Sequence, residues 1–122
     1  MANELTIDAQ VAYSDATGAT DGLSVAALEV TLGVKLFIHQ KVSVGTSEQA
    51  INVTGIATLG YCMIVNRDDT NFVEVRTATG ATKFAKLNAG EVALFRFGSG
   101  VTAPFILADT AACNVEILLF NE

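Results

Sequence analysis

The stretch FVEVRT, residues 72–77, decides the fold class of this chain. Val73 and Val75 fall on one side of an extended segment, while Glu74 and Arg76 fall on the other, so the side chains alternate with a period of two. That period is typical of a half-exposed β-strand. The same pattern can be followed outward from this stretch in both directions.

Alternation of this kind runs through LEVTL, LFIHQKVSV, YCMIVN, VALFRF and NVEILLF, and the segments between them are rich in turn-forming residues: GTSE, DDTN, TATGAT, NAGE, GSG and ADTAA. No long segment keeps a helical period. The closest candidate, DGLSVAALEV (residues 21–30), fits either a short helical turn or a strand. With eight or so strands and one proline, Pro104, near the start of FILAD, the sequence predicts an all-β fold, an antiparallel β-sandwich of jelly-roll-like type.

A chain of 122 residues is long enough for one core. We therefore predict a single sandwich domain over residues 1–122, with a regular meander of hairpins from Gly60 onward. The stretch YSDATGATDG, residues 13–22, is too poor in apolar residues to pack a core by itself. Residues 1–24 are accordingly a candidate arm or edge segment for contact with a neighbouring subunit, a hypothesis that would be wrong if this stretch were held wholly against its own subunit.

Composition argues against two classes of partner. The net charge is −6 and the seven Lys and Arg are scattered singly, which predicts no nucleic-acid partner. No apolar run approaches the roughly 18 residues of a membrane-spanning helix, which predicts no membrane partner. The N-terminus, MANELTIDAQ, lacks a basic segment followed by an apolar one, so we expect no secretory signal and synthesis in the cytoplasm.

Two adjacent carboxylates in NRDDTNF, residues 66–72, raise the question of a metal site. A calcium loop needs alternating carboxylates and carbonyls, a glycine and a downstream bidentate glutamate. Asp68 and Asp69 diverge on a turn, and nothing completes that pattern. The sequence favours, over a metal site, a hairpin loop from Asn66 to Asn71 whose Asp and Asn side chains bond backbone N–H groups.

No set of residues converges on catalysis. His39 is the only histidine, and its place in LFIHQK favours a surface or interface side chain. Ser43 lacks the G-x-S-x-G context of a nucleophile. Three strand glutamates are expected to face solvent: Glu74, Glu91 and Glu116. We therefore predict no catalytic, cofactor-binding or metal-binding residue, and no cofactor.

The two cysteines, Cys62 and Cys113, each sit in an apolar run, GYCMIV and AACNVEI, without C-x-x-C spacing. This favours two buried thiols that behave as small hydrophobic residues. A disulfide joining two adjacent strands is the alternative.

The stretch LNAGEVALFRF, residues 87–97, carries large apolar side chains on both faces of one strand. Phe95 and Phe97 lie on one face, and Val92 and Leu94 on the other. One face is expected to be covered by another subunit. Phe95, Phe97 and, in the N-terminal segment, Tyr13 are the candidate subunit-interface residues.

The second half of the chain resembles a known group of proteins. GYCMIVNRDDTNFVEV, then KFAKLNAGEVALFRF, and finally ADTAACNVEILLFNE follow one another as in small structural proteins of tailed-bacteriophage virions, of the head decoration or cement type. The resemblance covers roughly Gly60 to Glu122. In the first half, only HQKVSVGTSEQAI and a Ser/Thr/Gly-rich character are similar.

The resemblance implies a non-enzymatic role. Proteins of this type commonly sit as homotrimers on the outer surface of the capsid, at junctions between subunits of the major capsid protein, and stabilise the shell. A phage tail, collar or fibre component is the alternative. A carbohydrate-binding sandwich would need exposed aromatic platforms, whereas the chain has no Trp and only two Tyr, Tyr13 and Tyr61. An enzyme would need a convergent set of reactive groups.

Overall fold

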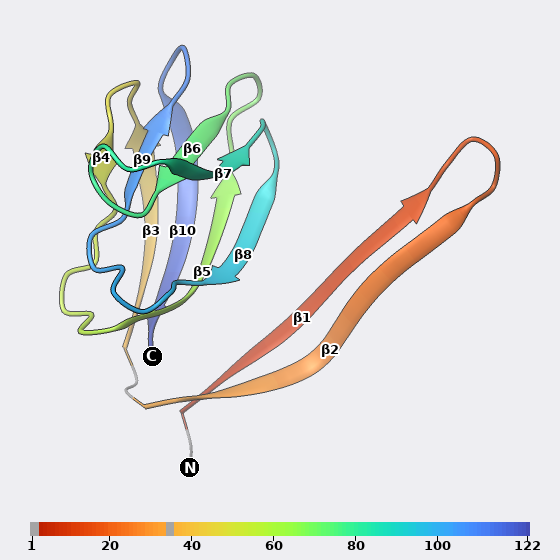
Figure 1. Ribbon diagram of the computed structural model, residues 1–122, viewed down its shortest axis with the longest axis horizontal. Helices are drawn as coiled ribbons and strands as arrows, with labels where there is room; N and C mark the ends of the chain where they lie inside the picture. The colour runs from red at the N-terminus through yellow and green to blue at the C-terminus, as the bar shows by residue number, and fades with distance from the viewer. Residues whose placement is uncertain (1–2, 34–35) are drawn as a thin grey trace. The chain divides into compact units, whose positions relative to one another are not determined.

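The structure is a computed structural model that describes residues 3–33 and 36–122. Within these residues 59% lie in strands, every strand pairing is antiparallel, and no helix is present (Figure 1). The predicted all-β, antiparallel fold is confirmed. The chain divides into two compact units, Met1–Lys35 and Leu36–Glu122.

The described residues form ten strands, two more than the eight or so expected. The first unit holds β1 (Asn3–Ser14) and β2 (Thr20–Leu32). The segment DGLSVAALEV lies within β2, so the strand alternative is right and the helical turn is wrong. The second unit holds the remaining strands: β3 (Phe37–Val44), β4 (Gln49–Ala50), β5 (Leu59–Asn66), β6 (Val73–Arg76), β7 (Lys83–Leu87), β8 (Val92–Arg96), β9 (Phe105–Ala108) and β10 (Cys113–Asn121).

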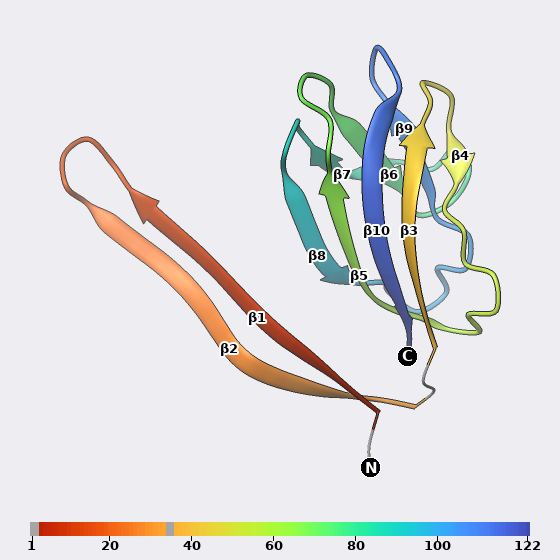
Figure 2. The same ribbon diagram turned by 180° about the vertical axis from the view of Figure 1, so that it is seen from behind.

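The second unit consists of two four-stranded sheets, with strand orders β3-β10-β5-β8 and β4-β9-β6-β7. Figure 1 shows the second of these in front, and Figure 2 shows the first from the other side. Among its described strands, only β6 and β7 are consecutive in sequence and paired with each other. The predicted meander of hairpins from Gly60 onward is therefore wrong. Alternation tells which side chains face the core, but it does not tell which strand lies next to which.

One hydrophobic core fills the space between the two sheets. Ile64, Ile117 and Leu119 come from one sheet and Val73 and Val75 from the other, and each is at most 1% exposed. In β6 the two valines are buried, and Glu74 and Arg76, which alternate with them, are half-buried, as FVEVRT predicts. The second unit is thus a β-sandwich whose inner faces are apolar.

Candidate functional site

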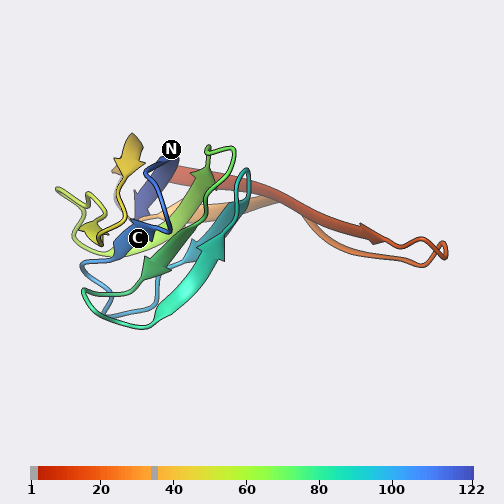
Figure 3. The same cartoon turned by 90° about the horizontal axis from the view of Figure 1, so that it is seen from above.

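The most unusual surface of this protein is one face of the hairpin formed by β1 and β2. The two strands pair along almost their whole length, from Asn3 opposite Leu32 to Ser14 opposite Thr20 (Figure 3). Residues directly opposite each other in an antiparallel pair share a face. One face therefore carries ten apolar residues: Leu5, Ile7, Ala9, Val11, Tyr13, Leu23, Val25, Leu28, Val30 and Leu32.

A β-bulge keeps that face continuous. In β2 the apolar residues are two apart except between Val25 and Leu28, where the spacing is three. In a regular strand this spacing would place Leu28 and the apolar residues after it on the opposite face from Val25. The register shifts at this point, so that β2 accommodates one more residue than β1. Ala27 adopts φ 52°, and its N–H donates to Asp8 Oδ1 at 2.8 Å. The bulge thus restores the phase of the pattern.

Much of this apolar face is exposed. Val11 is 70% exposed, Leu23 77% and Tyr13 58%, and Val25 and Leu28 are also exposed. Every residue from 13 to 22 is exposed, and the arm hypothesis stays a prediction. A two-stranded hairpin alone is at best marginally stable in water. An apolar face of this extent marks a surface for contact with another molecule.

The opposite face of the hairpin is polar and acidic. It carries Glu4, Asp8 and Glu29 among Thr, Ser and Gln side chains. At the turn, Asp15 Oδ1 accepts the hydroxyl of Thr17 at 2.7 Å and two backbone N–H groups at 2.9 Å. These hydrogen bonds, that of the Thr17 hydroxyl first, lower the pKa of Asp15 below its usual value. The hairpin is therefore amphipathic, and its turn is fixed by its own side chains.

A second exposed surface is the outer face of the sheet β3-β10-β5-β8. Val92 is 55% exposed and Met63 and Leu94, which lie opposite each other in β5 and β8, are each 40% exposed. Arg96 lies over the ring of Tyr61, with 4.8 Å between the guanidinium carbon and the ring centroid. This outer sheet face is apolar along β5 and β8 and charged beyond them.

The charged part of the outer face of the sheet β3-β10-β5-β8 centres on Glu116. This carboxylate accepts hydrogen bonds from Arg67 Nε at 3.1 Å and Nη2 at 3.0 Å, and it lies 2.5 Å from His39 Nε2. The bond to His39, followed by that to Arg67, lowers the pKa of Glu116. His39 is exposed on β3, so the prediction of a surface side chain is confirmed.

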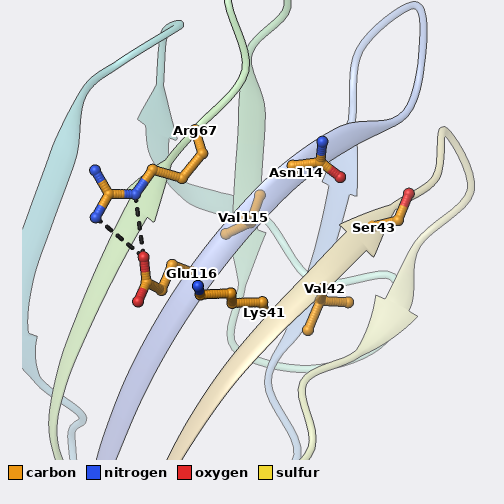
Figure 4. A pocket seen from close by; sticks show the side chains of 7 residues that line it. All are labelled: Lys41, Val42, Ser43, Arg67, Asn114, Val115 and Glu116. Carbon is orange, nitrogen blue, oxygen red and sulfur yellow. Dashed lines mark hydrogen bonds and ion pairs between the residues drawn. The ribbon is translucent and has the colours of Figure 1, made fainter.

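A shallow hollow of about 550 Å³ lies beside Glu116 (Figure 4). Lys41, Ser43 and Asn114 line it together with Arg67, whose charge Glu116 balances. Lys41 has no ion-pair partner within residues 3–33 and 36–122. The hollow therefore offers one free cation among open polar groups, which is too little to define a ligand.

The three predicted interface residues lie in different environments. Phe97 is only 5% exposed, and Phe95 is half-buried against the core. Their rings meet edge to face at 4.9 Å between centroids, and Phe95 meets Phe84 in the same way at 5.4 Å. Phe84, which is exposed, was missed because KFAKL shows no clean alternation. Tyr13 lies on the exposed apolar face of the hairpin. An interface role for Phe95, Phe97 and Tyr13 stays a prediction.

The acidic stretch is a structural loop, as predicted, but it is not a hairpin loop. Asp68 Oδ2 accepts the N–H groups of Thr70 at 3.0 Å and Asn71 at 2.7 Å, and these bonds lower the pKa of Asp68. The loop joins β5 to β6, which belong to different sheets. The predicted hairpin is wrong because the chain turns a corner between the two layers here.

Both cysteines are buried free thiols, as the sequence favours. Cys62 lies opposite Leu119 of β10, and Cys113 lies at the far end of the same strand. Six residues of strand separate Cys113 from Leu119, or about 20 Å. A disulfide needs Cα atoms within about 7 Å, so the alternative of a disulfide between adjacent strands is wrong.

The part of the chain that the structure describes contains no group of three or more His, Cys, Asp or Glu placed to hold a metal ion. Because residues 3–33 and 36–122 form no helix, they also offer no helix that could cross a membrane. Protein-family models, curated protein sequences and solved structures contain no match to this chain.

Proposed function

We propose that this protein is a non-enzymatic structural component of a tailed-phage virion, a decoration or cement protein that binds the outer surface of the head. In this role it contacts the major capsid protein at junctions between capsid subunits and stabilises the shell. It is made in the host cytoplasm and acts without nucleic acid, membrane or cofactor.

The exposed apolar face of the β1–β2 hairpin carries this proposal. Val11 and Leu23 are the most exposed large apolar residues of this face, at 70% and 77%, and they lie opposite each other. A surface of that kind serves association with another macromolecule. Polar side chains of the sandwich, such as Glu116 and Asp68, are instead occupied by hydrogen bonds within the chain. Binding therefore accounts for the surface better than catalysis.

Two further observations support the virion role in particular. One is the resemblance of Gly60 to Glu122 to phage decoration proteins. The other is the strand order: two four-stranded sheets, β3-β10-β5-β8 and β4-β9-β6-β7, with nearly all connections crossing between them. That order supports a jelly roll, an eight-stranded double sheet found in capsid proteins.

The test is the number of copies of this chain per major capsid subunit in purified particles, measured by quantitative mass spectrometry. About one copy per capsid subunit is the expected result. A few copies to a few dozen per particle would contradict the decoration role and favour the tail, collar or fibre alternative. Complete absence from particles would overturn the virion role.

A stability measurement tests the cement role separately. Heads that lack this chain should release DNA at a lower temperature than complete heads, and purified protein added back should restore the difference. A protein that binds only the assembled lattice stabilises it by mass action, and simultaneous contact with several subunits strengthens the effect. Equal release temperatures with and without the chain would contradict the cement role.

A further inference from the structure

We propose that Asp8 is a positioning residue for the apolar face of the β1–β2 hairpin: its carboxylate holds β2 in the register that keeps the ten apolar side chains on one face. The part of this inference that concerns the partner rests on the proposed function, in which that face contacts the capsid. The part that concerns the register of the hairpin is independent of the proposed function.

The two ends of the hairpin pair in registers that differ by one residue. The register shifts between Ile7 and Ala9. Asp8, which lies between them, thus faces two residues of β2, Ala26 and Ala27, instead of one. This arrangement of two residues against one is that of a β-bulge, and it changes the phase of the side chains of β2 relative to those of β1.

A regular hairpin without the bulge is the alternative. If the pairing of the turn end continued unchanged along β1, Leu28 would lie opposite Thr6. Val30 would lie opposite Glu4. Both apolar side chains would then share a face with the carboxylates, and neither face of the hairpin would be apolar throughout. A partner would meet a mixed surface.

The bulge has a backbone cost that burial of apolar side chains offsets only in part. Ala27 adopts φ 52°, a left-handed conformation that is unfavourable for a residue with a Cβ atom. Val25 is 44% exposed and Leu28 42%, even with the bulge in place. Because both side chains stay largely in water, their burial does little to select the bulged register. Another interaction has to hold the bulge.

Asp8 supplies that interaction. Its Oδ1 accepts the N–H of Ala27 across the hairpin at 2.8 Å. Ala27 is the one residue other than glycine with a positive φ in the part of the chain that the structure describes. A hydrogen bond to a carboxylate is stronger than one between neutral groups. The strongest local interaction thus falls on the residue whose backbone the bulge strains.

The Asp8 carboxylate therefore determines which fraction of the free protein presents the continuous apolar face. A partner that binds this face binds the bulged register, so its apparent affinity decreases with the fraction of chains in that register. Because Asp8 lies on the polar face, it acts on the partner through the backbone of β2 and not by direct contact.

The first experiment measures the register of the full chain by NMR, from cross-strand contacts between backbone protons. In the wild type we expect the contact of Ile7 with Leu28, and in Asp8→Ala a contact of Ile7 with Ala27 instead. Asp8→Asn, which keeps an acceptor oxygen, and Gln10→Ala, a change on the same face, should retain the wild-type contacts. Wild-type contacts at full strength in Asp8→Ala would overturn the inference.

A deletion separates the bulge from the rest of the hairpin. Deletion of Ala27 leaves the apolar residues of β2 two apart throughout, so a regular hairpin then presents the same apolar face without a bulge. In this background we expect Asp8→Ala to change nothing. The deletion also covers the case in which Asp8→Ala alone unfolds the hairpin, because it should then restore the cross-strand contacts. The same loss with and without Ala27 would show that Asp8 acts in another way, and the inference would be wrong.

The second experiment adds the partner. Phage heads that lack this chain are titrated with each variant, and the bound protein is measured after sedimentation. We expect Asp8→Ala to bind about tenfold more weakly than the wild type, which corresponds to the loss of one hydrogen bond to a charged group. Asp8→Asn, and Asp8→Ala combined with deletion of Ala27, should bind like the wild type.

The outcomes distinguish this inference from the proposed function. Equal binding of Asp8→Ala and the wild type would overturn the role given to Asp8 and leave the proposed function intact. Absence of binding by the wild type would instead overturn the proposed function, and the NMR measurement would still decide whether Asp8 holds the register.

Discussion

The stability of this protein depends on the ionisation of single side chains, and Glu116 is the clearest example. Its carboxylate joins β10 to His39 on β3 and to Arg67 after β5. A carboxylate that joins neighbouring strands in this way stabilises the fold only while it is ionised, which makes its contribution depend on pH.

We predict that Glu116→Gln makes the stability of the protein less dependent on pH in the acid range. Because the pKa of Glu116 is lower in the folded chain than its usual 4.5, its contribution is fully present above pH 4.5. It is lost as the pH falls through the lowered value. Urea denaturation between pH 3 and pH 7 should show a shallower acid slope for the variant.

Glu4→Gln is the control for that measurement, since Glu4 has no ion-pair or hydrogen-bond partner among the described side chains. It should keep the wild-type slope. If Glu116→Gln and the wild type lose stability in parallel as the pH falls, the role given to Glu116 is wrong.

The thiols are predicted to be inert in the folded protein. Burial raises the pKa of Cys62 to about 12 and also raises that of Cys113, where the nearby Asp68 and Asp109 add to the effect. At pH 8 both remain protonated, and the thiolate is the reactive form. A thiol-specific reagent should label neither cysteine in the native chain and both in denaturant. Rapid labelling of native Cys62 would contradict this.

At the scale of elements, the corner between β5 and β6 depends on a buried amide. Asn66 is fully buried, and its Nδ2 donates to the backbone carbonyls of Asn71 at 2.9 Å and of Leu87 and Asn88 at 3.2 Å. Its Oδ1 accepts the N–H of Asp68 at 3.0 Å. One side chain thus connects the corner to the end of β7.

We predict that Asn66→Ala destabilises the protein by about 2 kcal/mol, because it leaves several buried backbone groups without a partner. The measurement is the free energy of unfolding in urea. Asp69→Ala, in the same loop but exposed, should change it by less than about 0.5 kcal/mol. Similar losses for the two variants would show that the amide has no special role.

At the scale of the whole molecule, the hairpin and the sandwich differ in how their apolar residues are covered. The sandwich buries its inner faces between two sheets, whereas the hairpin leaves Val11, Leu23 and Tyr13 exposed. The stability of the hairpin is therefore expected to depend on other copies of the chain.

We predict that the melting temperature of the wild type rises by a few degrees between low and high micromolar concentration, since association stabilises the folded state by mass action. Calorimetry at several concentrations is the measurement. The double variant Val11→Asp, Leu23→Asp, which changes the two most exposed large apolar side chains of the hairpin, should melt at a temperature independent of concentration. A constant melting temperature for the wild type would contradict the association.

Local sequence patterns predicted those features of the fold that depend only on near neighbours in the chain. Alternation in FVEVRT predicted the strand and its buried valines, and the Asp and Asn side chains of residues 66–71 predicted a loop held by side-chain to backbone bonds. The buried thiols followed from apolar runs around Cys62 and Cys113. Each of these three features is determined by residues that lie within a few positions of one another in the sequence.

By itself, then, the sequence determined the all-β class, the buried valines of β6, the two buried thiols and the loop chemistry of residues 66–71. Only the tertiary structure decided that β5 and β6 lie in different sheets, that Phe97 is buried while Phe84 is exposed, and that a bulge at Ala27 keeps the hairpin apolar on one face. The physical reason is that a period of two assigns a side to each residue, whereas strand neighbours and register are chosen by long-range pairing and by the volume of the core.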